Sequence, residues 1–174
     1  EEIQEAIDKY IYSTTEISFE TVLGEMLRER NLSIGSAESC TGGYISHLLT
    51  EIPGASDYFK GSIVSYSNEI KESILGVKFE TLKTHGAVSE ATVSEMLSGA
   101  IKQLNVDIAI AVSGVAGPGG GSTEKPVGCV FIGIANQHNQ YIKRLQFTNN
   151  RERNIQLSAI TAFVMLKKFL LKEY

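Results

Sequence analysis

The strongest constraint on the fold is a short apolar run near the middle of the chain. Within residues 107–113 the sequence reads Ile108-Ala-Ile-Ala-Val112, with no polar residue inside the run. A strand that is apolar on both faces has to be covered on both faces, as happens in sheets that lie between helices. The run therefore predicts a central strand with helical layers on either side.

Helical and extended patterns alternate around this strand. Predicted helices span residues 18–30, 42–50 and 89–104, a short one is capped by Asn68 and ends at Gly76, and a last one runs from Asn150 nearly to Tyr174. Predicted strands span residues 33–38, 62–67, 107–113, 127–135 and 141–147, the last two as a hairpin. This alternation predicts an α/β fold with a mixed sheet between helical layers.

The composition excludes several classes of function. The 174-residue chain is 43% hydrophobic and 21% charged, with a net charge of −4, as in an ordinary globular domain. The negative balance removes the basic field on which non-specific nucleic-acid binding depends. No apolar run approaches the roughly 18 residues of a membrane span. We therefore expect a cytoplasmic protein that binds neither nucleic acid nor a membrane.

The cysteines and histidines do not predict a metal site. Cys40 and Cys129 are far apart and form no CxxC pair, so we expect two reduced thiols. The histidines at positions 47, 85 and 138 are scattered, with no pair at helical spacing. A zinc site needs several such residues to converge, and we expect neither a metal nor another cofactor.

Three segments break the pattern of core and surface, and each follows a predicted strand. They are Ser36-Ala-Glu-Ser39-Cys-Thr-Gly-Gly43, Ser65-Tyr-Ser-Asn-Glu-Ile-Lys71, and the loop 113–126, which has five glycines between Gly114 and Gly121. Ligands of α/β sheets gather beyond the carboxyl ends of strands. Hydroxyl groups, one lysine, a helix start and a glycine-rich anion cradle would therefore meet there.

Each segment alone also has a purely structural interpretation: a capped tight turn, a solvated helix lysine, or a mobile connection. Phosphoryl chemistry on the glycine-rich loop is disfavoured, because no P-loop lysine or pair of Mg²⁺-binding carboxylates accompanies it. Together the segments favour a Ser–Lys hydrolase. In such an enzyme the lysine amine takes the serine proton and the helix N-terminus holds the oxyanion. Burial and a neighbouring cation such as Arg151 are expected to lower the pKa of the lysine.

Five blocks also resemble, in order, the signature blocks of the CinA C-terminal domain, the nicotinamide mononucleotide deamidase (PncC) family. They are Ala37-Glu-Ser-Cys-Thr-Gly-Gly43, Tyr66-Ser-Asn-Glu-Ile-Lys71, His85-Gly-Ala-Val-Ser-Glu90, Ser113-Gly-Val-Ala-Gly-Pro118 and Glu124-Lys-Pro-Val-Gly128. The resemblance covers about residues 18–170. It implies a three-layer α/β/α sandwich with a mixed five-stranded sheet. It also implies hydrolysis of the carboxamide of nicotinamide mononucleotide to nicotinate mononucleotide and ammonia, in pyridine nucleotide salvage.

The resemblance assigns roles by position. Ser39 matches the nucleophile and Lys71 the base, with Tyr66 beside them. The implied substrate-binding residues are Thr41, Gly42, Gly43, Ser113, Gly114, Gly117 and Arg151. Asn149 stands where the family usually has glycine, and Ile155-Gln156 where a second arginine is common. Asparagine tolerates a left-handed backbone, so we expect the turn before Arg151 to survive.

The resemblance also suggests a division of the chain. Residues 1–17 resemble the connector that follows the N-terminal domain of longer CinA proteins, and residues 18–174 would form the amidohydrolase domain. The implied partners are the small-molecule substrate and an N-terminal CinA domain, and we expect a homo-oligomer. The alternative is a catalytically silent binding or scaffold domain of a CinA-like competence/damage-inducible protein. The set of Ser39, Tyr66 and Lys71 favours the enzyme, and an ammonia-release assay separates the two hypotheses.

Overall fold

A five-stranded mixed sheet forms the centre of the computed structural model, which describes residues 17–174. The predicted connector lies outside the described residues except for its last position. The strands are β1 (Ile34–Glu38), β2 (Phe59–Val64), β3 (Ile108–Gly114), β4 (Cys129–Ala135) and β5 (Gln140–Gln146), in the order β2-β1-β3-β4-β5. β1 runs parallel to β2 and β3, whereas β4 is antiparallel to both β3 and β5.

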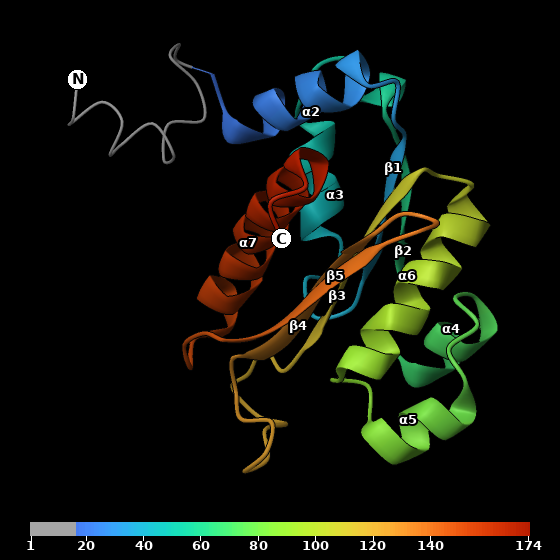
Figure 1. The fold of residues 1–174 in the computed structure, drawn as a ribbon. Helices are drawn as coiled ribbons and strands as arrows, with labels where there is room; N and C mark the ends of the chain where they lie inside the picture. The colour runs from blue at the N-terminus through green and yellow to red at the C-terminus, as the bar shows by residue number, and fades with distance from the viewer. Residues whose placement is uncertain (1–16) are drawn as a thin grey trace.

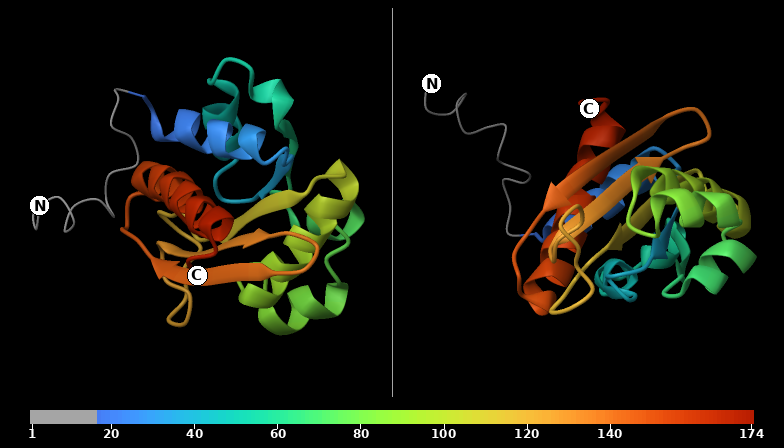
Figure 2. Two further views of the ribbon diagram at one scale, coloured as in Figure 1. Left: turned by 45° about the horizontal axis from the view of Figure 1, so that its top comes forward. Right: turned by 90° about the horizontal axis from the view of Figure 1, so that it is seen from below.

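Helices cover both faces of this sheet (Figure 1 and Figure 2). One layer contains α2 (Phe19–Glu29), α3 (Tyr44–Thr50) and α7 (Arg151–Leu171); the other contains α4 (Asn68–Ser73), α5 (Phe79–His85) and α6 (Glu90–Leu104). A short 3₁₀ helix, η1 (Ala55–Asp57), precedes β2. The predicted α/β fold with a mixed five-stranded sheet is confirmed.

The alternation of side-chain size along β3 explains the two layers. Ile108, Ile110 and Val112 belong to the core beneath α2, α3 and α7, whereas Ala109 and Ala111 belong to the core beneath α6. Small side chains on the second face let α6 approach the sheet closely. At Gly133 on β4, a Cβ atom would lie 2.7 Å from Leu97 of α6. Close packing of this kind makes large-to-small and small-to-large changes costly.

Side-chain caps begin the long helices where the sequence predicts them. Ser18, Ser89 and Asn150 accept hydrogen bonds from backbone N–H groups in the first turns of α2, α6 and α7. The cap of α4 is a correction, because Ser67 rather than Asn68 accepts the N–H group of Ile70. β2 ends at Val64, three residues before the predicted end of the strand, which leaves residues 65–67 free to turn into α4.

Two further helices differ from the sequence-based expectation. The helix predicted at 42–50 begins at Tyr44, because Gly42 and Gly43 have left-handed backbones with φ of 61° and 99°. Helix α5 is not predicted at all. Its first residue, Phe79, is largely exposed and Leu82 is its only buried residue, so it has no apolar periodicity.

Helix α7 is long and apolar enough, by length and composition alone, to cross a membrane, and it is the only such helix in the described part of the chain. The sequence-based expectation was that no such segment exists. The apolar character of α7 has a local explanation, since Ala159, Ala162, Phe163 and Leu166 are fully buried in the core against the sheet. α7 is thus a core helix of the sandwich.

Candidate active site

Ser39 and Lys71 meet at the carboxyl edge of the sheet. Ser39 follows the last residue of β1, and Lys71 lies on α4, which follows β2, so the parallel pairing of the two strands brings them together. Lys71 Nζ donates to Ser39 Oγ at 3.0 Å and to the Ser65 carbonyl at 2.6 Å. The Lys71 side chain is only 1% exposed. A buried amine is therefore held against the predicted nucleophile.

Burial shifts the pKa values of two side chains at this site, Lys71 and Cys40. It lowers the pKa of the Lys71 amine below its ordinary value of 10.5, while an ionised Cys40 would act in the opposite direction. Burial also raises the pKa of Cys40 to about 12, so that thiol stays protonated at neutral pH. Arg151 does not contribute to the shift at Lys71, contrary to the sequence-based expectation. Burial alone favours a neutral amine.

A cavity of about 190 Å³ opens beside Ser39. The predicted site residues that line it are Ser39, Tyr66, Lys71, Ser113, Gly114 and Arg151. Other predicted residues do not line it: Thr41, Gly42, Gly43 and Gly117. The structure thus brings together the three predicted catalytic residues and three of the seven predicted substrate-binding residues.

Arg151 lines this cavity and is held by two hydrogen bonds. Its Nη2 donates to the Tyr66 hydroxyl at 3.1 Å and its Nη1 to the Gly117 carbonyl at 2.9 Å. Gly117 thus holds the arginine through its backbone, although it lies outside the lining. Asn149 does not have a positive φ, so the left-handed backbone expected there is not needed. The guanidinium keeps further N–H donors for an anionic ligand.

Part of the cavity lining is apolar and comes from residues to which the sequence assigned no role. Ala87 and Val88 line it, and Ser113 Oγ donates to the Ala87 carbonyl at 2.7 Å. Lys125 Nζ donates to the carbonyl of His85, which ties the glycine-rich loop to the same segment. This loop projects beyond the lower edge of the sheet in Figure 1. The block His85-Gly-Ala-Val-Ser-Glu90 was the feature of the sequence that could have identified this wall.

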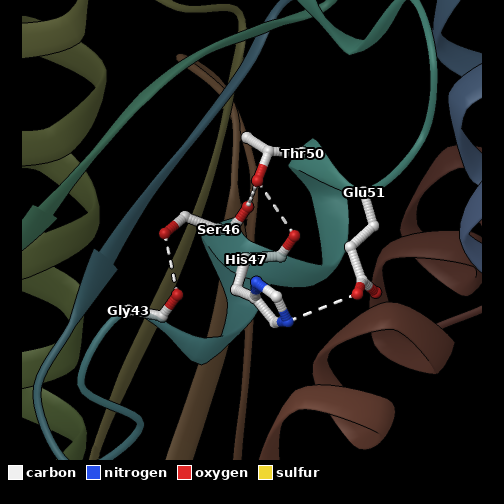
Figure 3. Close-up of polar contacts among 5 residues, drawn as sticks. All are labelled: Gly43, Ser46, His47, Thr50 and Glu51. Carbon is white, nitrogen blue, oxygen red and sulfur yellow. Dashed lines mark hydrogen bonds and ion pairs between the residues drawn. The ribbon is translucent and has the colours of Figure 1, made fainter.

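The turn between β1 and α3 corrects one part of the predicted chemistry. The buried carboxylate of Glu38 accepts the N–H groups of Gly43, Ile45 and Ser46. The start of α3 is therefore not free to hold an oxyanion. Figure 3 shows the same helix start, where Ser46 Oγ donates to the Gly43 carbonyl at 2.8 Å.

Two N–H groups of this turn remain available. Over residues 39–46, those of Cys40 and Thr41 donate to no carbonyl or carboxylate oxygen within the described part of the chain, and the Cys40 N–H group lies beside its own thiol. Cys40 also lines the cavity. As for metals, residues 17–174 contain no cluster of three or more His, Cys, Asp or Glu side chains that could hold an ion.

Comparisons with known proteins agree with these features. The family model of the CinA C-terminal domain matches residues 16–170. A CinA-like protein of Thermotoga neapolitana is 45% identical over 170 residues, covering 98% of this chain and 41% of the relative. A CinA-like protein of Amoebophilus asiaticus is 44% identical over 162 residues, covering 93% of this chain and 39% of the relative. The chain thus spans about two-fifths of the length of the curated relatives that it matches.

Solved structures give the same result. A competence-damaged protein (CinA) superfamily protein from Klebsiella pneumoniae has a TM-score of 0.86 at 34% identity, covering 88% of this chain and 96% of that one. A competence/damage inducible protein from Agrobacterium tumefaciens has a TM-score of 0.81 at 36% identity, covering 89% and 98%. The sequence and the fold therefore both relate this chain to CinA and competence/damage-inducible proteins.

Proposed function

Since the chain belongs to the CinA C-terminal domain family, we propose that it hydrolyses the carboxamide of nicotinamide mononucleotide to nicotinate mononucleotide and ammonia. The observation that carries the proposal is the buried Lys71 amine 3.0 Å from Ser39 Oγ, at the wall of a cavity. A lysine that is kept from solvent and has a lowered pKa is suited to act as a base toward a hydroxyl group.

The reaction proceeds through an acyl-enzyme. Neutral Lys71 takes the Ser39 hydroxyl proton as Oγ attacks the carboxamide carbon, and the carbonyl oxygen becomes an oxyanion. Lys71 then gives its proton to the departing nitrogen, so ammonia leaves and an ester to Ser39 remains. Water, deprotonated by Lys71, attacks this ester, and its collapse releases the carboxylic acid and restores the Ser39 hydroxyl.

The two free N–H groups of the turn are the proposed donors to the oxyanion. The N–H groups of Cys40 and Thr41 donate to no carbonyl or carboxylate oxygen and lie directly after the proposed nucleophile, whereas those at the start of α3 are taken by Glu38. Backbone donors adjacent to a nucleophilic serine stabilise the charge that develops in the tetrahedral intermediate. Protonated Cys40 takes no part as a nucleophile.

The shape and charge of the cavity support a cyclic aromatic carboxamide that carries a phosphate. Ala87, Val88 and Ala116 offer apolar contacts to a ring. Arg151 also lines the cavity, where its guanidinium can pair with phosphate oxygens.

An ammonia-release assay with nicotinamide mononucleotide tests the proposal directly. The protein is expected to release ammonia and nicotinate mononucleotide in equal amounts, and the Ser39→Ala variant is the blank. Release no faster than this blank would overturn the proposal and favour the silent scaffold domain.

A further inference from the structure

Glu38 is a fully buried carboxylate directly before the nucleophile, and the proposed reaction does not use it. It is the last residue of β1, and its side chain reaches across the turn to the start of α3. Its Oε2 accepts the N–H groups of Gly43 at 3.0 Å and Ile45 at 3.1 Å. Its Oε1 accepts from Ser46 N at 2.9 Å, Ser36 Oγ at 3.2 Å and Ser62 Oγ at 3.3 Å. Five polar groups thus contact one side chain, and the Ser36 hydroxyl shares its single proton between Glu38 and Ser62 Oγ, which lies at 2.8 Å.

These contacts enclose the segment that carries Ser39. Residues 39–42 lie between Glu38 and the first N–H group that its carboxylate holds, so the side chain closes a loop around the turn. Within this loop the Gly42 N–H group donates to the Ser39 carbonyl at 3.1 Å. The Ser39 N–H group donates in turn to Val112 of β3 at 3.0 Å. The backbone of the nucleophile is thus fixed from both sides.

Glu38 also adjoins the segment that holds the base. Its backbone carbonyl accepts the N–H group of Ser65 at 2.8 Å, and the Ser65 carbonyl accepts from Lys71 Nζ at 2.6 Å. Ser62, whose hydroxyl donates to the Glu38 carboxylate, lies on β2 just before that segment. One residue therefore contacts the strand that leads to Ser39 and the strand that leads to Lys71.

We propose that Glu38 is a positioning residue, which holds Ser39 Oγ at reacting distance from Lys71 without touching the substrate. This inference rests on the proposed Ser39–Lys71 chemistry. A displacement of about 1 Å at a reacting group can lower a rate about 10²-fold. An amide in place of the carboxylate has one acceptor oxygen and an NH₂ group that faces donors, so at least one backbone N–H group of the turn loses its acceptor.

The matched control is a second carboxylate at the far end of β1. Asp107 Oδ2 accepts the N–H group of Ser33 at 2.8 Å and the Ser33 hydroxyl at 2.6 Å, at the amino end of β1 and β3. Asp107→Asn thus makes the same chemical change at the other end of β1, remote from the cavity. Any general effect of removing a carboxylate that binds backbone N–H groups will appear in this variant.

The experiment measures Glu38→Gln, Glu38→Asp and Asp107→Asn in the full chain. The readouts are kcat and KM with nicotinamide mononucleotide, the thermal midpoint, and the rate at which a sulfonyl fluoride labels Ser39, followed by intact mass. Both Glu38 variants are expected to lose about 10- to 100-fold in kcat and in labelling rate, with KM within about threefold. Asp107→Asn should stay within about twofold in every rate.

Several results would overturn the inference. These are Glu38 variants that keep the parent kcat and labelling rate, rates that fall equally in Asp107→Asn, or failure of both Glu38 variants to fold. A parent protein that labels at Ser39 but releases no ammonia overturns the proposed substrate only, and the labelling rates still decide the role of Glu38. A parent that does neither removes the premise and the inference with it.

Discussion

At each end of β1 a carboxylate accepts backbone N–H groups, but one carboxylate is exposed and the other is buried. At the amino end, exposed Asp107 accepts the backbone N–H group of Ser33. At the carboxyl end, fully buried Glu38 accepts three backbone N–H groups, and beside it lie Ser39 and the buried Lys71. Exposed polar groups of this kind stabilise a fold at little cost, whereas buried ones require complete pairing. Under the proposed function, the carboxyl end is the place where stability is given up for reactivity.

Proton affinities show the same contrast. Burial lowers the pKa of Lys71, so protonating it is less favourable in the folded state than in the unfolded chain. Hydrogen bonds from the Ser33 hydroxyl and N–H groups lower the pKa of Asp107, so its ionised form favours folding. Lys71 therefore opposes folding at neutral pH and Asp107 supports it. If the contrast holds, substitutions at the carboxyl end of β1 will change activity, and substitutions at its amino end will change only stability.

The largest effect is expected at the nucleophile. Ser39→Ala removes the proposed nucleophilic atom, so under the proposed mechanism deamidation should fall by about 10³-fold or more. Ser33→Ala, at the amino end, is the matched change and should keep activity within about twofold. Circular dichroism checks that both variants are folded. If folded Ser39→Ala retains activity within about threefold of the parent, Ser39 is not the nucleophile.

The base should be nearly as sensitive. Lys71→Arg keeps a positive charge but cannot release a proton at working pH, so a loss of about 10²- to 10⁴-fold is expected, close to that of Lys71→Ala. In the parent, activity should rise with pH along a single limb that lies below the ordinary lysine value of 10.5. Substantial activity of Lys71→Arg with the same limb would mean that the lysine only positions Ser39, and Tyr66 would become the candidate base.

A smaller effect is expected at Arg151, which lines the cavity. Arg151→Ala should weaken binding of nicotinamide mononucleotide about 10- to 100-fold, the usual range for losing a charge-assisted hydrogen bond. Binding of the dephosphorylated riboside should change much less. Arg153→Ala, an exposed arginine on the same helix, is the control. Equal losses for both ligands would assign Arg151 to the structure or to the carboxamide side.

The smallest effects are on stability, and their signs should differ between the two ends. Lys71→Met should raise the thermal midpoint by about 2–4 °C, the shift that roughly 1 kcal/mol produces in a chain of this size. The gain should be full below the lowered pKa of Lys71 and shrink as the pH approaches 10.5. Asp107→Asn should instead lower the midpoint at neutral pH by up to about 2 °C. That loss should disappear as the pH falls through the lowered pKa of Asp107.

Thermal scans across pH, monitored by circular dichroism, check both variants. A destabilised Lys71→Met at neutral pH would mean that the buried amine is fully compensated by its partners. The contrast between the two ends of β1 would then be wrong.

Local features of the sequence were enough to predict the fold. The apolar run at Ile108–Val112, the caps at Ser18, Ser89 and Asn150, and the hairpin after the glycine-rich loop all depend on residues close together in the chain. Periodicity and capping act over one or two turns, so they can be read without knowing the tertiary structure. Helix α5 was not predicted, because it has no apolar pattern of its own and its position depends on packing against α6.

The sequence by itself determined which residue types stand in the segments that follow the strands, namely Ser39, Lys71 and Arg151. Tertiary structure alone decided which of them meet: the lysine is buried against the serine, while Gly42 and Gly43 stay outside the cavity. Only the tertiary structure revealed Glu38, whose five polar contacts come from β1, β2 and α3. The physical reason is that burial and hydrogen-bond partners arise between segments distant in sequence, and these decide whether a polar residue is solvated, structural or reactive.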